Sequence, residues 1–116
     1  MATIANPYDK AHELARSIIN SSIYANYIQA KERVEKQPEY REKIFNFREK
    51  QMRVNRAELL GEELPETLVH ELSVEFAKLN RTKEIADFFQ AEQSFIRMFS
   101  DIQEILHKSL QVGLGE

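Results

Sequence analysis

The stretch that decides the fold is TKEIADFFQAEQSFIRMFSDIQEILHKSLQV, residues 82–112. Its apolar residues recur at spacings of three, four and seven, which is typical of a helix that packs against other helices. Such a helix of about thirty residues spans about 45 Å, whereas a compact domain of this length has a radius of gyration of about 13 Å. One copy would cover this stripe incompletely, so we expect a homodimer or higher homo-oligomer. The alternative is that the third and fourth helices cover the stripe within one chain.

One charged residue, Glu92, interrupts this apolar seam. Seven-residue steps place it in line with Ile85, Phe99 and Leu106. A carboxylate in such a seam must pair or accept hydrogen bonds, because burying it alone is costly. We therefore interpret Glu92 as a buried polar contact that sets orientation or register, rather than as a catalytic acid. Its expected partners are a tyrosine hydroxyl or one of Arg48, Arg53 and Arg56. The predicted interface residues of this helix are Phe88, Phe95, Phe99, Ile102 and Leu106.

The rest of the chain also predicts helices. Three glycines and three prolines are too few for a strand-rich fold with many tight turns. Asn6-Pro7 supplies a cap and a first helical residue, and Gly61 is a natural helix end. We expect one helix after Pro7, a second over about 22–36, a third over about 38–60, a fourth after Pro65, and a break or a bend at 80–82.

The predicted fold is therefore all-α, with about five helices and long antiparallel third and C-terminal helices in an oligomer-forming bundle. The length of 116 residues allows one core, so we expect a single all-helical domain over residues 1–116. Residues 1–5 and 113–116 are expected to be frayed.

The composition excludes several kinds of chemistry. Without cysteine the chain has no disulfide, no thiolate nucleophile and no cysteine-held metal or iron–sulfur cluster. His12, His70 and His107 fall on three different predicted helices, and no glycine-rich phosphate loop or Gly-x-Ser-x-Gly motif occurs. We expect no enzymatic activity, and no catalytic, cofactor-binding or metal-binding residues.

The charges are unevenly distributed. Residues 31–58 contain nine Lys or Arg against six Glu, whereas residues 59–77 contain five Glu and neither Lys nor Arg. Arg48, Arg53 and Arg56 form a candidate basic face, either a solvated surface or a contact for RNA or an acidic protein. The net charge of −3 argues against general nucleic-acid binding. The polarity also suits a contact between the basic third helix of one subunit and the acidic fourth helix of another.

No segment predicts export or membrane insertion. The N-terminus lacks a basic region followed by an apolar run, and no stretch reaches 18 uncharged apolar residues. We expect a cytoplasmic protein.

Several short stretches along residues 6–112 resemble the YlbF/YheA/YmcA family of small bacterial helical proteins. The strongest is Phe88-Phe89-Gln90-Ala91-Glu92-Gln93-Ser94-Phe95, similar to the family's Ala-Glu motif in the last helix. The others are Leu14-Ala15 with Ile18, Ser22 and Tyr27, Phe45-x-Phe47-Arg48 with Gln51, Gly61-Glu62-Glu63, and Ile102 with Ile105.

The resemblance implies an all-helical fold that forms dimers or higher oligomers. It also implies a non-enzymatic regulatory or adaptor protein that acts by helical protein–protein contacts and is linked to competence, sporulation and biofilm control. Characterised relatives work in a complex that influences RNA processing by a membrane-bound ribonuclease. Some relatives hold iron–sulfur clusters through cysteines, which this chain lacks, so no such cofactor is expected here. The alternative function is an RNA-associated module that uses the basic third helix.

Overall fold

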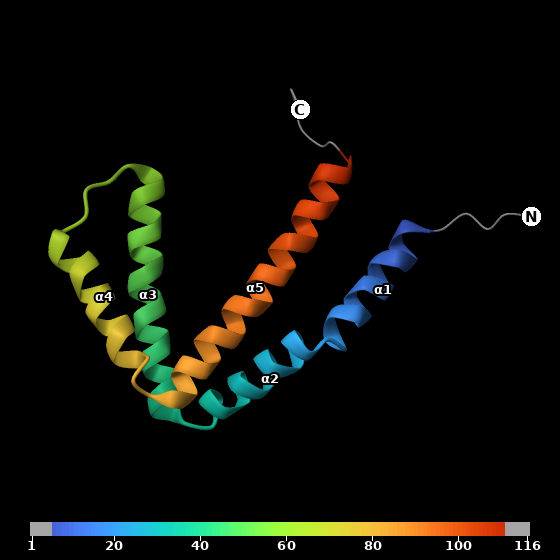
Figure 1. Cartoon of the computed structure of the whole chain (residues 1–116). Helices are drawn as coiled ribbons and strands as arrows, with labels where there is room; N and C mark the ends of the chain where they lie inside the picture. The colour runs from blue at the N-terminus through green and yellow to red at the C-terminus, as the bar shows by residue number, and fades with distance from the viewer. Residues whose placement is uncertain (1–5, 111–116) are drawn as a thin grey trace, which may run out of the picture. The chain divides into compact units, whose positions relative to one another are not determined.

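A computed structural model describes residues 6–110 of the chain. It contains helices and connecting turns but no strand (Figure 1). The all-α fold with about five helices is therefore confirmed. Val112, the last residue of the expected final helix, and the ends expected to fray, 1–5 and 113–116, lie outside the described residues. The helices are α1 (Pro7–Ile19), α2 (Ser22–Glu35), α3 (Pro38–Leu60), α4 (Glu66–Leu79) and α5 (Lys83–Leu110).

The N-terminal helices begin and end at residues whose side chains satisfy free backbone groups. The side chain of Asn6 accepts a hydrogen bond of 2.9 Å from the backbone N–H of Tyr8, and proline stands at the first position of α1. Between α1 and α2, the Ser21 hydroxyl donates to the carbonyl of Ile18 at 2.6 Å and accepts from the N–H of Tyr24 at 3.2 Å. One serine thus closes one helix and caps the next.

The later boundaries follow from backbone conformation. Gly61 ends α3 in the left-handed region with φ of 69°, which costs glycine little because it has no Cβ. The chain is also interrupted after Leu79, where the Asn80 side chain donates a 2.8 Å hydrogen bond to the carbonyl of Phe76. The expected interruption at 80–82 is therefore a break between α4 and α5.

The chain forms two compact units. Unit 1 contains the described residues of 1–29 and 91–116, and unit 2 contains residues 30–90. Helices α2 and α5 each contribute to both units. The expectation of a single domain stays a prediction.

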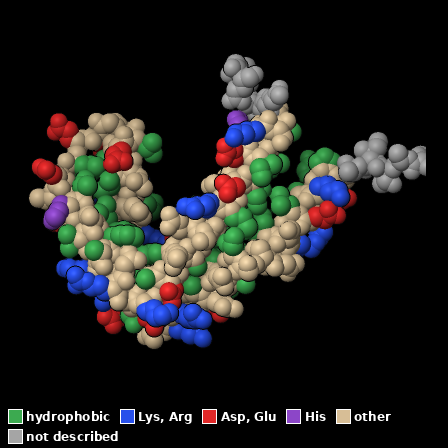
Figure 2. Space-filling model, in the orientation of Figure 1, with side chains coloured by type: hydrophobic (Ala, Val, Ile, Leu, Met, Phe, Trp, Pro, Cys, Tyr) green, Lys and Arg blue, Asp and Glu red, His purple; other side chains and the backbone are tan. Residues whose placement is uncertain are grey.

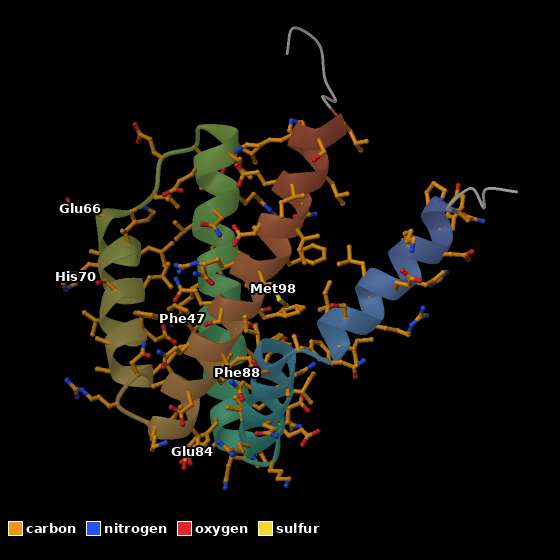
Figure 3. All side chains as sticks on the ribbon, turned by 45° about the vertical axis from the view of Figure 1, so that its right-hand side comes forward. Phe47, Glu66, His70, Glu84, Phe88 and Met98 are labelled. Atoms are coloured by element: carbon orange, nitrogen blue, oxygen red, sulfur yellow. The ribbon has the colours of Figure 1, made fainter. Side chains whose placement is uncertain are left out.

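Unit 2 holds the buried core. Its centre includes Ile85, which is only 1% exposed, and an aromatic cluster of Phe47, Phe76 and Phe89 with ring centroids 5.7–6.1 Å apart. Figure 3 shows Phe47 between α3 and α4. All the buried hydrophobic residues of the described chain lie in this unit: Ala30, Val34, Ile44, Phe47, Val54, Ala57, Leu79, Ile85 and Phe88.

Helices α3 and α4 form an antiparallel hairpin within unit 2 (Figure 1). The Lys50 ammonium on α3 lies 2.9 Å from a carboxylate oxygen of Glu75 on α4, and both side chains are partly buried. Because this ion pair is partly buried, water and salt screen it less than they screen the ion pairs on the exposed helix surfaces. It therefore adds an electrostatic contact between helices that are otherwise joined by apolar packing.

Unit 1 is organised around an aromatic contact between α2 and α5. The rings of Tyr27 and Phe95 are stacked with centroids 5.1 Å apart and an interplanar angle of 9°. Tyr24 lies tilted against Phe95 at 5.5 Å. Such pairs contribute about 0.5–1.5 kcal/mol beyond the area they bury.

We expect Ile85→Ala to lower the free energy of unfolding by about 2–5 kcal/mol, because it opens a cavity at the most buried side chain of the core. Ile105→Ala is the matched control, since Ile105 lies on the same helix and is 62% exposed. Its effect should stay within about 0.5 kcal/mol. Urea unfolding followed by circular dichroism at one fixed protein concentration measures both. Equal losses for the two variants would contradict this assignment of the core.

Candidate interaction surface

The second half of α5 carries an apolar row that the described chain covers only in part. Phe99 is 47% exposed, Leu106 is 51% exposed and Leu110 is 68% exposed. Phe95 and Ile102, from the same predicted seam, are half-buried. Figure 2 shows hydrophobic side chains gathered along this part of α5.

Helix α1, in the same unit, is also amphipathic and also uncovered. Ala11, Leu14, Ala15 and Ile18 fall on one side of it, yet none of its thirteen residues is buried. An isolated helix of this length is marginal in water, because nucleation is costly and packing normally supplies the stability. A covered apolar face would therefore stabilise α1.

Helix α1 and the second half of α5 share their incomplete burial with the rest of unit 1. None of its described residues, 6–29 and 91–110, is buried. Its residues still show regular helical patterns with one apolar side. The sequence of unit 1 is therefore typical of helices that pack against one another. In a single copy of the chain, however, its described residues do not form a buried core.

Phe88 differs from the other residues predicted for the interface. It is 6% exposed and belongs to the core of unit 2, next to Phe89 at a centroid distance of 6.0 Å. The seam is one row in the sequence, but its first residues, Ile85 and Phe88, are already covered within the chain. The residues of the predicted interface that are not buried within the chain are Phe95, Phe99, Ile102 and Leu106, which we call the α5 surface.

Glu92 lies between these two parts of the seam and is half-buried. It takes part in a polar interaction within the structure. The role of this interaction as an orientation or register contact, and an arginine or tyrosine as its partner, stay predictions.

The candidate basic face is divided by the fold. The Arg48 guanidinium lies over the ring of Phe88, 5.4 Å from its centroid, and is half-buried. Arg53 and Arg56 are exposed. The cation–π contact directs Arg48 toward the core of unit 2, so the three arginines do not share one solvent-exposed face.

Among residues 6–110, no group of three or more His, Cys, Asp or Glu side chains is placed to hold a metal ion. On the exposed surface of α5, Lys108 lies 2.8 Å from a carboxylate oxygen of Glu104. This hydrogen bond and the opposite charge lower the pKa of the Glu104 carboxyl and raise the pKa of the Lys108 ammonium. Such a pair on one helix face is a surface feature.

Another apolar row, on α3, was visible in the sequence but not assigned to the surface. Phe45, Met52 and Leu59 follow one another at seven-residue spacing and are 60%, 65% and 87% exposed. The inward residues of α3 follow a different row that contains Ile44, Phe47 and Val54. The separate seven-residue spacing was the available signal, but sequence alone does not tell which of two adjacent rows is buried.

None of the helices of residues 6–110 has an apolar stretch of the length needed to cross a membrane.

Comparison with known proteins gives a match over nearly the whole chain. Residues 8–111 match the sequence model of a family described as control of competence regulator ComK, YlbF/YmcA. Among curated proteins, a UPF0342 protein of Symbiobacterium thermophilum is 30% identical over 92% of this chain and 96% of its own length. A UPF0342 protein of Caldicellulosiruptor bescii is 28% identical over 91% of this chain and 89% of its own length.

The fold also matches a solved structure. A protein of unknown function (DUF964) from Bacillus stearothermophilus aligns with a TM-score of 0.79 and 19% sequence identity, covering 90% of this chain and 91% of that one. At this identity the likeness shows that the fold is shared.

We expect Glu92→Ala to lower the free energy of unfolding by about 1–3 kcal/mol, since it removes one partner of a half-buried polar interaction. Gln93→Ala is the control, because Gln93 is the next residue of the same helix and is exposed. Chemical denaturation of the two variants beside wild type measures the difference. A loss no larger for Glu92→Ala than for Gln93→Ala would reject a polar contact at this position.

Proposed function

We propose a function for this chain on the premise that it belongs to the family described as control of competence regulator ComK, YlbF/YmcA. The protein is a non-enzymatic regulatory or adaptor protein. It acts through contacts between helices rather than through catalysis. Its role is of the kind linked to competence, sporulation and biofilm control in proteins that it resembles. The observation that carries the proposal is the absence of a buried residue among residues 6–29 and 91–110, which make up the described part of unit 1.

A second copy of the chain is the partner proposed for the α5 surface. Phe95, Phe99, Ile102 and Leu106 form an apolar row at three- and four-residue spacing, which suits packing against another helix. Most oligomers of identical chains close by two-fold symmetry, so the same row on each copy can bury the other. Helix α1 supplies further apolar surface in the same unit.

Binding of RNA by the basic face has less support. Arg53 and Arg56 are exposed, but Arg48 is engaged with the Phe88 ring. A row of phosphates requires several cations along one exposed track. Two arginines on α3 beside an apolar row fit a protein partner better than a nucleic acid.

We expect Phe99→Asp to abolish self-association through the α5 surface, because it places a charge in the middle of an apolar contact. Wild-type protein should sediment as a dimer or a larger species, and the variant should shift to smaller species. Analytical ultracentrifugation over a concentration series measures this shift.

Ser100→Asp is the matched control, since it adds the same charge to the next, exposed residue of α5. It should associate as wild type does, and both variants should keep the helical circular-dichroism signal. A monomeric wild type, or unchanged association of Phe99→Asp, would refute self-association through this surface. In the native host, deletion of the gene should change transcript abundance, and re-expression of wild type but not of Phe99→Asp should restore it.

A further inference from the structure

The α3–α4 hairpin has an uncovered side that the α5 surface does not explain. The row of Phe45, Met52 and Leu59 on α3 is 60–87% exposed, although the opposite side of the same helix is packed in the core. Arg56 stands between Met52 and Leu59 along the helix and is exposed. We call this row together with Arg56 the α3 surface.

Helix α4 presents a surface of complementary character. Val69 and Phe76 are each 48% exposed. The Phe76 ring also packs against the rings of Phe47 and Phe89, so it offers a partner only the part that remains exposed. Glu66, at the start of the helix, is exposed and lies three residues before Val69. Figure 3 shows Glu66 on the side of α4 that faces away from α3. We call Glu66, Val69 and Phe76 the α4 surface.

The two surfaces match in antiparallel register. If Arg56 faces Glu66, then Met52, four residues back on α3, faces Val69, three residues forward on α4. Phe45, eleven residues back, then faces Phe76, ten residues forward. The distance along the helix from Phe45 to Arg56 is about 16–17 Å and that from Glu66 to Phe76 is about 15 Å, at 1.5 Å per residue. One charge pair and two apolar pairs therefore align together, whereas Leu59 extends past the start of α4. In a parallel arrangement, Phe45 would face the carboxylate of Glu66.

The contact cannot form within one chain. The side of α3 that meets its own α4 carries Lys50, which reaches Glu75, and Phe47, whose ring centroid lies 5.8 Å from that of Phe76. The α3 surface is exposed in the presence of that α4. Among residues 6–110, neither Arg56 nor Glu66 forms an ion pair. The α3 surface and the α4 surface can therefore each contact a second copy of the chain.

We propose that the α3 surface of one copy docks against the α4 surface of a second copy, with Arg56 opposite Glu66 of that copy. This contact is additional to the one through the α5 surface and links the basic and acidic halves of the hairpin. The sequence polarity, with nine Lys or Arg in residues 31–58 and none in 59–77, favours this pairing over two α3 surfaces meeting face to face.

A charge-swap experiment tests the contact. Sedimentation equilibrium compares wild type, Arg56→Glu, Glu66→Arg and the double variant Arg56→Glu/Glu66→Arg at low salt. Wild type should form species larger than those that the α5 surface alone produces. Each single variant should weaken this step by at least about tenfold, because like charges then face each other. The double variant should return to within about threefold of wild type.

Glu71→Arg is the matched control for the charge change, since Glu71 is exposed on α4 outside the proposed surface. It should associate as wild type does. Circular dichroism and the thermal midpoint should be alike in all five proteins. The proposed register would be overturned if wild type formed no species larger than those produced by the α5 surface. It would also be overturned if the double variant associated as weakly as the single variants.

The same variants separate this contact from the alternatives. An RNA partner would be lost in Arg56→Glu, gained or unchanged in Glu66→Arg, and not restored in the double variant; that pattern, measured with a labelled single-stranded RNA, would overturn the proposal. Phe99→Asp tests the α5 surface independently. The hairpin contact should persist in Phe99→Asp, so either contact can fail without the other.

Discussion

The organisation of this protein depends on one continuous helix that serves two environments. Helix α5 runs without interruption from Lys83 to Leu110. Its first turns place Ile85 and Phe88 in the core of unit 2, where they are 1% and 6% exposed. The helix then continues with the same apolar periodicity into unit 1, where no described residue is buried. Because a helix repeats its faces at fixed intervals, the apolar row extends beyond the core that covers its beginning.

This arrangement gives the two units different physical characters. Unit 2 is stabilised by aromatic packing around Phe47 and by the partly buried ion pair of Lys50 and Glu75. Most other ion pairs of the described chain join exposed side chains one helical turn apart and contribute little stability. In unit 1 the rings of Tyr27 and Phe95 are stacked, and none of the described residues is buried.

The proposed contacts share a physical logic. On α5 the uncovered row is apolar, so a second copy of the same row can bury it by symmetry. On the α3–α4 hairpin each apolar row carries a charge, and the charges on the two helices are opposite, which sets a register as well as an attraction. The chain belongs to the family described as control of competence regulator ComK, YlbF/YmcA. The proposed contacts are the means by which we expect it to act on other proteins.

The sequence by itself determined the helices and their ends. Asn6-Pro7, Gly61 and Pro65 act through local backbone geometry and hydrogen bonds, so their effect could be predicted without knowledge of the fold.

The tertiary structure alone decided which of the similar apolar rows is buried. Ile85 and Phe99 occupy equivalent positions in one row of seven-residue steps, yet Ile85 is 1% exposed and Phe99 is 47% exposed. Arg48 and Arg56 likewise look alike in the sequence, but only Arg48 lies over the Phe88 ring. Periodicity identifies the side of a helix that is apolar, whereas burial depends on which other helix packs against that side.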